Sequence, residues 1–309
     1  SFLATLHALF HGFDVFHFHA LGPSTFAFLP RLFGKKVVCT IHGLDWQRDK
    51  WGGLARKYLQ FGEYCIAKFA HVAISVSDNL VSYFRHKYKK ELIYIPNGVN
   101  MPAVKPADLI TSVYGLKANE YILYLGRLVP EKGIHYLIDA YQRLKPSVKL
   151  VIAGGSSHTT DYVQQLHDMA EGCESILFTG FVQGQVLDEL FSNAFLYVLP
   201  SDLEGMPISL LEAMSYGQAC LVSDIEENKA VVGNHGFYFS QGNINSLYKA
   251  LKRLTSGLQS FDKYKSAAMN YVRENFNWGD VTLRHHKVYE SLQKAPKQRG
   301  LAMVKANKT

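Results

Sequence analysis

The chain has 309 residues, of which 48% are hydrophobic and 19% charged, a composition typical of a folded globular protein with room for two ordinary domains. Its net charge of +7 is spread along the chain apart from a basic C-terminal stretch, which argues against nucleic acid as a partner and favours acidic small molecules or an anionic membrane surface. The four cysteines show no metal-ligand spacing and no apolar run reaches about eighteen residues, so we expect a cytoplasmic protein with reduced thiols, soluble or peripheral on the inner membrane face.

The first hundred residues alternate between helix-like and strand-like segments, beginning with the end of an amphipathic helix at residues 2–11. Strands are predicted at residues 14–19, 36–40, 72–76 and 92–95, and helices at residues 23–33, 55–69 and 78–88. This alternation indicates parallel strands joined by right-handed crossovers. The pattern ends after Pro96-Asn97-Gly98, and Pro102 and Pro106 indicate a linker.

A second alternating set follows the linker. Its predicted strands are residues 121–126, 148–153, 176–179, 195–199, 219–223 and 236–239, and its predicted helices are residues 134–144, 161–169, 185–191, 207–217 and 244–254. The sequence therefore predicts an α/β protein with two Rossmann-like, doubly wound domains, the first short of its opening strands and the second six-stranded. A last helix at residues 278–292 can pack on either half, and the basic residues 296–309 are expected to be frayed.

The stretch from Phe195 to Gly217 combines a buried strand, a polar loop and a helix. Pro207 is expected as the first helical residue, where its missing N–H costs nothing. Glu204 and Glu212 lie on either side of this helix start with seven residues between them. A helix N-terminus favours an anionic ligand, and carboxylates beside such a site would bind sugar or ribose hydroxyls. Two solvated acids at a helix start explain the pair equally well.

Other strands of the second set also end in residues suited to a ligand, at the sheet edge where open parallel sheets bind one. Arg127 and Lys132 come before the next helix and suit a diphosphate. Gly154 belongs to a double-glycine turn that permits close backbone approach, and Phe181 and Val182 offer an apolar surface for a base. Taken singly, each feature is explained as well by surface charge, an ordinary turn or core packing.

The first half offers two histidines on one strand. Alternation places His17 and His19 on one face of strand 14–19 near its carboxyl end, while Phe16 and Phe18 face the other side. Histidines at such positions are more often structural than functional, so the pair alone does not identify a site.

The next loop carries residues that suit a sugar acceptor: His42, Asp45, Trp46 and Arg48 can stack and hydrogen-bond, although a solvated loop with packing tryptophans is the simpler reading. The sequence contains no Asp-x-Asp pair and no metal-ligand cluster. We therefore expect neither a metal nor another cofactor, and a bound nucleotide diphosphate would be neutralised by protein cations.

Three motifs in the correct order resemble the family 4 retaining glycosyltransferases of the GT-B fold: PNGV at 96–99, GRLVPEKG at 126–133 and EGMPISLLEAM at 204–214. The resemblance covers essentially the whole chain. The segments FHFHALGPS and TIHGLDWQRDKW are most similar to bacterial members that build cell-surface polysaccharide. The resemblance implies that a nucleotide-sugar donor and a glycan or lipid-linked acceptor meet in a cleft between two domains.

The resemblance also implies roles for matching residues. Arg127 and Lys132 would hold the donor diphosphate and stabilise the leaving group, and His19 would donate a hydrogen bond to the donor hexose. Glu204, with the backbone N–H groups of Gly205 and Met206, would meet the donor sugar and phosphate, while Glu212 would bind the ribose. The residues implied in catalysis are Arg127, Lys132, Glu204 and His19, and those implied in donor binding are Glu212, Gly205, Met206, Pro207, Gly154, Phe181 and Val182.

The resemblance further predicts retention on one face of the sugar, with a donor phosphate oxygen accepting the proton of the acceptor. We expect an acceptor-side domain over residues 1–100, a donor domain over 101–272, a returning helix over 273–295 and a tail over 296–309. Family members carry an additional strand and a glycine-rich loop before the strand at 14–19, so we expect an N-terminally truncated sequence. A non-catalytic nucleotide-sugar-binding module and a GT-B nucleotide-sugar epimerase remain the alternatives.

Overall fold

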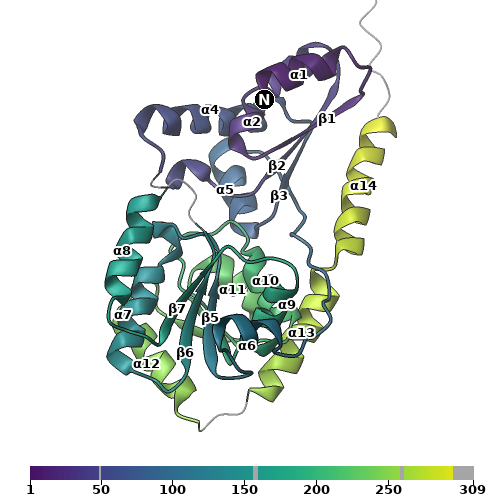
Figure 1. The fold of residues 1–309 in the computed structure, drawn as a ribbon. Coiled ribbons are helices and arrows are strands. Elements are labelled where there is room, and N and C mark those ends of the chain that lie inside the picture. Colours follow the sequence, from purple (N-terminus) through teal and green to yellow (C-terminus); the bar gives the residue numbers. More distant parts are fainter. Residues whose placement is uncertain (49, 156–158, 258–260, 295–309) are drawn as a thin grey trace, which may run out of the picture.

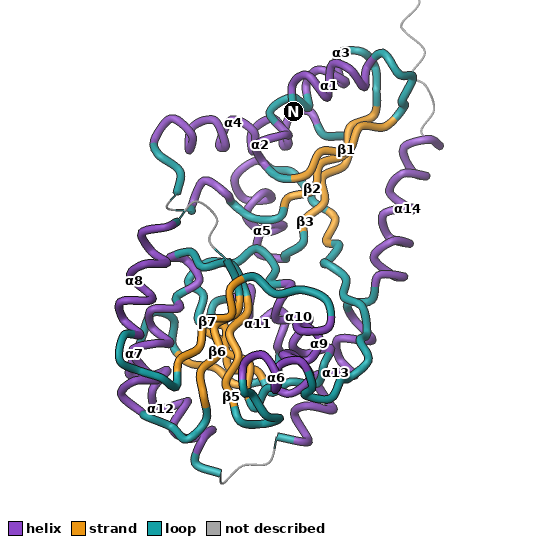
Figure 2. The backbone as a smooth tube through the Cα atoms, viewed as in Figure 1, coloured by secondary structure: helices purple, strands orange, loops and turns teal. Residues whose placement is uncertain are grey.

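The computed structural model describes residues 1–48, 50–155, 159–257 and 261–294, and their strands form two parallel sheets (Figure 1; Figure 2). The first sheet has four strands in the order β1-β2-β3-β4, and the second has six in the order β10-β9-β8-β5-β6-β7. Helices cover the sheets, so the predicted α/β class with two doubly wound units is confirmed. The basic tail at 296–309 lies outside the described residues.

The first unit follows the predicted alternation. Its strands are β1 (Val15–His19), β2 (Lys36–Ile41), β3 (Val72–Ser75) and β4 (Ile93–Tyr94), and its helices are α1 (Phe2–Leu9), α2 (Leu21–Ser24), α3 (Phe28–Leu32), α4 (Gly53–Phe69) and α5 (Asp78–Tyr88), with a 3₁₀ turn η1 (Asp45–Gln47). The prediction of one helix over residues 23–33 was wrong. The Ser24 and Thr25 hydroxyls donate to the backbone carbonyls of Ala20 and Gly22, and Pro30 has no N–H for the carbonyl four residues earlier, so the segment divides.

The second unit contains β5 (Tyr121–Leu125), β6 (Lys149–Ala153), β7 (Ile176–Gly180), β8 (Leu196–Leu199), β9 (Cys220–Ser223) and β10 (Phe237–Phe239). Its helices are α6 (Leu109–Tyr114), α7 (Ile134–Leu144), α8 (Thr160–Ala170), α9 (Gln185–Asn193), α10 (Ile208–Ser215), α11 (Glu226–Val232), α12 (Ile244–Thr255) and α13 (Asp262–Asn275), with a 3₁₀ turn η2 (Pro130–Lys132). Because β5 pairs with both β6 and β8, the strand order reverses between β5 and β8. Ligands of such sheets bind outside this reversal.

Three helices of the second unit were not predicted: α6, α11 and α13. The first of them lies inside the expected linker, where the buried carboxylate of Glu189 on α9 accepts hydrogen bonds from the backbone N–H groups of Asp108 and Ile110 at 3.0 Å each. A side chain about eighty residues away thus satisfies the start of this short helix, which no local pattern could indicate.

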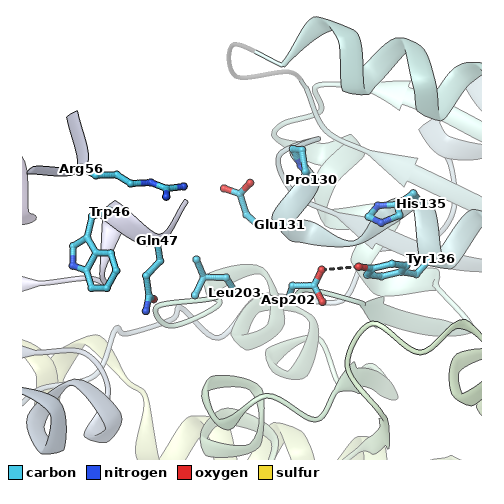
Figure 3. A pocket seen from close by; sticks show the side chains of 9 residues that line it. All are labelled: Trp46, Gln47, Arg56, Pro130, Glu131, His135, Tyr136, Asp202 and Leu203. Atoms are coloured by element: carbon cyan, nitrogen blue, oxygen red, sulfur yellow. Dashed lines mark hydrogen bonds between the residues drawn. The ribbon is translucent and has the colours of Figure 1, made fainter. Parts of the chain in front are cut away.

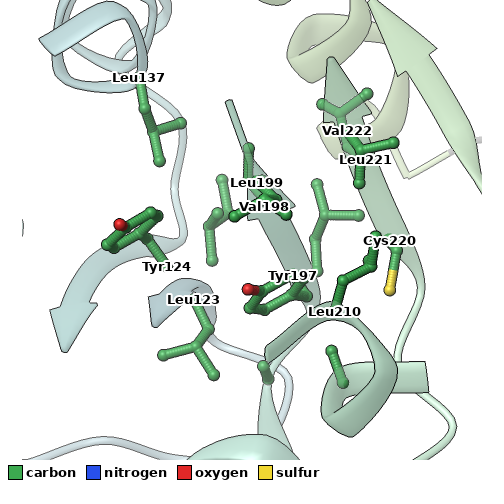
Figure 4. Packing of buried hydrophobic residues seen from close by; sticks show 14 of the residues in the cluster. Leu123, Tyr124, Leu137, Tyr197, Val198, Leu199, Leu210, Cys220, Leu221 and Val222 are labelled. Atoms are coloured by element: carbon green, nitrogen blue, oxygen red, sulfur yellow. The ribbon is translucent and has the colours of Figure 1, made fainter. Parts of the chain in front are cut away.

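Central strands of the second sheet are buried on both faces, as expected for a parallel sheet covered by helices. Leu123, Tyr197, Val198 and Leu221 are fully buried and pack with Leu210 of α10 (Figure 4). This core fixes the helix α10 against β8 and β9, so that the loops leaving the strands project from a rigid base.

The last helix, α14 (Trp278–Lys294), runs from the second unit to the first (Figure 1). Its residues Val281, Val288 and Leu292 pack against buried side chains of β2 and β3. In the part of the chain that the structure describes, no helix is both long and apolar enough to cross a membrane.

Candidate functional site

Loops from the carboxyl ends of β5 and β8 face the first unit, and the two units touch there. The backbone of Gly205 packs on the carbonyl of His42, so closely that a Cβ at this position would lie 1.7 Å from that oxygen. The backbone N–H of Asn97 also lies 3.1 Å from Sδ of Met206. The structure therefore holds the two units in contact across the reversal point.

A buried ion pair joins two of the predicted site residues. Nζ of Lys132, in the turn η2, lies 2.5 Å from Oε1 of Glu204, and the two side chains are only 12% and 8% exposed. The Ser201 hydroxyl donates to the same oxygen at 2.6 Å. The structure thus brings together residues from the two motifs, while Arg127 follows β5 as an exposed side chain.

Helix α10 begins one residue later than predicted. Pro207 is the residue before the helix, with φ −75° and ψ 101°, and Ile208 is the first helical residue. Glu212 lies one turn further along, as expected, and burial raises the pKa of its carboxyl group. It lines a cavity of about 480 Å³ with Leu187 and Ile208. A partly buried carboxyl group near a helix start is placed to accept hydrogen bonds from a hydroxylated ligand.

Backbone segments after β5 and β6 approach closely at Gly154. This glycine has φ +144°, and a Cβ there would lie 1.8 Å from the carbonyl oxygen of Gly126, so no other residue fits without a backbone shift. Past β7, Phe181 is 78% exposed and Val182 is half-buried. Phe181 therefore leaves an exposed aromatic ring at the carboxyl end of β7.

Histidines of the first unit form a cluster with the last helix. His17 bonds to the Tyr289 hydroxyl at 2.7 Å and the Thr40 hydroxyl at 2.8 Å, and Nδ1 of His19 lies 3.1 Å from Nε2 of His42. Burial, together with repulsion from His19, His285 and His42, lowers the pKa of His17 to about 3. The pKa values of His19 and His42 are also lowered, chiefly by burial, so His17, His19 and His42 are neutral at pH 7.

Sequence reasoning missed the contribution of α14 to this cluster. Trp278, His285 and Tyr289 line a cavity of about 280 Å³ together with the two histidines of β1 and with His42, which follows β2. The spacing of Trp278, His285 and Tyr289 indicates that they share one face of the last helix, because residues three, four and seven apart lie on the same side of a helix. The residues alone left open which unit that face meets, and only the family resemblance predicted that the helix returns to the first unit.

The predicted acceptor residues do not all gather in one place. His42 belongs to the histidine cluster, and Arg48 pairs with Asp45 at 3.4 Å. Trp46 instead faces the second unit and lines a groove of about 670 Å³ between the units (Figure 3). Among the described residues, no group of three His, Cys, Asp or Glu side chains is arranged to hold a metal ion.

Two family models match the chain: glycosyltransferase family 4 over residues 1–101 and glycosyl transferases group 1 over residues 111–270. The chain is similar to an Escherichia coli UDP-Gal:alpha-D-GlcNAc-diphosphoundecaprenol alpha-1,3-galactosyltransferase, with 29% identity over 71% of this chain and 60% of the relative. It is also similar to the Escherichia coli O-antigen chain mannosyltransferase B, with 27% identity over 58% of this chain and 48% of the relative. The chain thus spans less than two thirds of the length of these relatives.

Two solved structures share the fold. HepE of Anabaena, in complex with UDP and glucose, matches with a TM-score of 0.82 and 18% identity over 93% of this chain and 81% of that one. Sucrose-phosphate synthase from Thermosynechococcus elongatus matches with a TM-score of 0.83 and 21% identity over 95% and 77%. Both likenesses support the GT-B arrangement of the two units.

Proposed function

The chain belongs to the glycosyl transferases group 1 family, and on this premise we propose that it moves a sugar from a nucleotide-diphosphate donor to a glycan or lipid-linked acceptor, with retention. The observation that carries the proposal is the buried Lys132–Glu204 pair at the reversal point, beside the start of α10. It puts a cation for phosphate and a carboxylate for sugar hydroxyls within hydrogen-bond distance of each other.

Each site residue receives a role in this proposal. Arg127 and Lys132 neutralise the donor diphosphate and the charge that develops on it as the glycosidic bond breaks, so no metal ion is required. The phosphate and sugar of the donor lie against the backbone N–H groups of Gly205 and Met206 and against Pro207, the residue before α10. Glu212 accepts from the ribose hydroxyls, and the base lies over Phe181 and Val182, with Gly154 allowing the loops to close under it.

His19 contacts the donor sugar in this proposal. Its Nδ1 lies 3.1 Å from Nε2 of His42. We assign the tautomer in which His42 donates and His19 accepts, because it leaves the proton of His19 on Nε2. That N–H can donate to a sugar hydroxyl. A donor phosphate oxygen takes the acceptor proton on the same face. The two histidines therefore position the donor sugar and take no part in proton transfer.

The organisation of the chain follows from these roles. We propose an acceptor-side domain over residues 1–100, a donor domain over 101–272 and, within the predicted segment 273–295, a returning helix that corresponds to α14 (Trp278–Lys294). The packing of α14 on β2 and β3 supports the last assignment, because this helix ties the two units together. His42, Asp45, Trp46 and Arg48 belong to the acceptor side.

We also propose that the chain docks peripherally on the cytoplasmic face of an anionic membrane through α4. Leu54, Tyr58, Phe61 and Tyr64 are exposed at 87%, 46%, 50% and 47%, and their spacing puts them on one helix face. Vesicles containing phosphatidylglycerol should pull down the chain, and Phe61→Ser should weaken this binding. Leu283→Ser, which alters an exposed leucine of α14, is the matched control.

Nucleotide binding tests the donor site directly. Melting temperatures of the chain with UDP, GDP, ADP or dTDP, without metal, should rise for one base. Arg127→Ala and Glu212→Ala should abolish the rise, whereas Arg143→Ala, which alters an exposed arginine of α7 paired with Asp139, should not. The absence of any shift would contradict the proposed donor site.

Turnover distinguishes the remaining candidates. Release of the nucleotide diphosphate from the matching donor sugar in the presence of glycan or lipid-linked acceptors supports transfer. Binding without turnover of any acceptor would support a non-catalytic module, and conversion of the donor sugar without an acceptor would support an epimerase. Full transfer by Arg127→Ala would contradict the assigned role of this arginine.

A further inference from the structure

The groove between the two units is built by side chains of mixed character. It has a volume of about 670 Å³, with walls from η1 and the start of α4 on one side and from η2, α7 and the loop after β8 on the other (Figure 3). Its lining includes Trp46, Gln47, Arg56, Glu131, Tyr136 and Asp202. It opens at the same interface as the buried Lys132–Glu204 pair, since Lys132 and Glu204 adjoin Glu131 and Leu203 in the chain.

Aromatic and hydrogen-bonding groups alternate in this groove. The indole ring of Trp46 lies on one wall and the phenol ring of Tyr136 on the other (Figure 3). The Tyr136 hydroxyl donates to Oδ2 of Asp202 at 3.0 Å, and the carboxylate of Glu131 points into the space between the walls. Aromatic faces pack against the C–H face of a sugar ring, and carboxylates accept from its hydroxyls.

The charges of the groove select against an anion. Glu131 and Asp202 each bring a carboxylate, whereas Arg56 is the single cation among the described residues of the lining. Burial and the nearby Asp202 raise the pKa of Tyr136, so its hydroxyl stays protonated. Burial lowers the pKa of His135, which also lines the groove and is neutral at pH 7. A ligand carrying a carboxylate or phosphate would therefore meet net negative charge.

Trp46 is held in place from behind by a buried carboxylate. Its Nε1 donates to Oε2 of Glu63 at 2.7 Å. The other oxygen of Glu63, which is 0% exposed, accepts from the Tyr83 hydroxyl at 2.9 Å and from Nζ of Lys87 at 2.8 Å. A buried carboxylate is costly unless it is fully paired, and this one is paired with three side chains from two elements, η1 and α5. The orientation of the indole ring is thus set before any ligand arrives.

We propose that this groove binds an uncharged sugar residue of the acceptor, with Trp46 as its stacking platform and Glu63 as the positioning residue for Trp46. The proposal rests on the proposed transfer function and names its acceptor class. Because its two walls come from different units, a sugar bound here contacts both of them when the units meet. The phosphate of a lipid-linked acceptor then lies outside this groove.

Saturation-transfer NMR on the whole chain tests the proposal, using the methyl α-pyranosides of glucose, galactose, mannose and N-acetylglucosamine as probes. At least one of them should bind, and methyl α-D-glucuronide, which adds a carboxylate to the glucose ring, should bind about tenfold more weakly than methyl α-D-glucopyranoside. Failure of all four neutral probes, or equal or tighter binding of the glucuronide, would overturn the proposal.

Substitutions assign the binding to this groove. Trp46→Ala should weaken the probe by about tenfold or more, and Glu63→Gln by a smaller factor, since the platform is kept and its orientation loosened. Glu91→Gln, the same change at an exposed carboxylate paired with Arg85, should leave binding unchanged. If Trp46→Ala does not fold, Trp46→Phe keeps a ring and removes the bond to Glu63, and it should weaken the probe severalfold. Unchanged binding in the folded Trp46 variant would refute the assignment.

Nucleotide-induced melting shifts on the same samples separate this proposal from the proposed function. Sugar binding that fails while a nucleotide still shifts the melting temperature overturns the groove assignment and leaves the donor site standing. Glu63→Gln must keep the wild-type nucleotide shift, because Glu63 lies in the first unit and acts only through Trp46. A variant that loses both probe binding and the nucleotide shift is unfolded, so each variant must first show a cooperative melting curve like that of the wild type. Among variants that pass this check, loss of probe binding alone supports the role of Trp46.

Discussion

The contact between Gly205 and His42 makes domain closure sensitive to a single methyl group. In Gly205→Ala the new Cβ would lie 1.7 Å from the carbonyl oxygen and 2.9 Å from the carbonyl carbon of His42. Ordinary contact begins at 3.4 Å, so the two backbones must separate by about 1.7 Å. Both contacting groups are backbone, and neither can turn aside as a flexible side chain would.

Such a shift is large for a reaction that depends on positioning. A displacement of about 1 Å can cost about 10²-fold in rate, so we expect Gly205→Ala to lower kcat by about 10²-fold or more. Binding of the free nucleotide diphosphate should change little, because Arg127, Lys132 and Glu212 all belong to the second unit and the N–H of residue 205 is kept. Nucleotide release in the presence of acceptor measures kcat, and calorimetry measures the affinity for the free nucleotide diphosphate.

A matched glycine provides the control for this prediction. At Gly53, near the start of α4, no atom of the described residues lies within 4 Å of the place that an added Cβ would take, and φ is not positive. Gly53→Ala therefore adds the same group without a clash and should retain wild-type kcat. If Gly205→Ala turned over at the wild-type rate, the closed contact would not be the reacting arrangement, and the steric reasoning would be refuted.

Three further predictions concern charge. Glu204→Gln should bind free nucleotide diphosphate more tightly than wild type and Lys132→Ala more weakly, as measured by calorimetry. Burial raises the pKa of Glu212, so stability that is present below the unfolded pKa of this carboxyl group is lost as the pH rises through the raised folded pKa. Glu212→Gln should therefore raise the melting temperature at pH 7 while weakening nucleotide binding. The pKa of His17 is lowered to about 3 in the folded state, so the stability that this residue contributes above about pH 6.5 is lost as the pH falls. The free energy of unfolding, measured with urea, should fall by about 2 kcal/mol between pH 7.5 and 5, and His17→Gln should reduce this fall.

Local sequence pattern predicted the sheet strands well because each buried strand is a short apolar run bounded by turn residues. Strands such as β5 and β8 need no distant partner to be recognised. The helices α6, α11 and α13 were not predicted, because they are short or weakly patterned and depend on tertiary contacts. The hydrogen bonds that Glu189 accepts from the start of α6 illustrate this dependence.

The site residues likewise include some that a local pattern reveals and others that depend on distant contacts. Lys132 and Glu204 were predicted from motifs whose spacing is local, and the parallel sheet then brings the two loops together. The bond between His17 and Tyr289 joins residues 272 positions apart, and that between Trp46 and Glu63 depends on how a loop folds over α4. No single-sequence pattern encodes such pairings, so the histidine cavity and the groove became visible only in three dimensions.

The opposite outcomes expected for Glu204→Gln and Lys132→Ala follow from what the ion pair does before a donor arrives. A nucleotide diphosphate that recruits Lys132 must draw its ammonium group away from Glu204, which is only 8% exposed and would keep the hydrogen bond from the Ser201 hydroxyl. Leaving a buried charge under-satisfied costs about 1–3 kcal/mol. The hydroxyls of a donor sugar can supply the missing partners, whereas a free nucleotide diphosphate cannot. The pair therefore favours binding of the complete donor over binding of the free nucleotide diphosphate and assists release of this product. Glu204→Gln removes the cost of the unpaired carboxylate and should bind the nucleotide diphosphate more tightly. Weaker binding of the nucleotide diphosphate by that variant would contradict this reasoning.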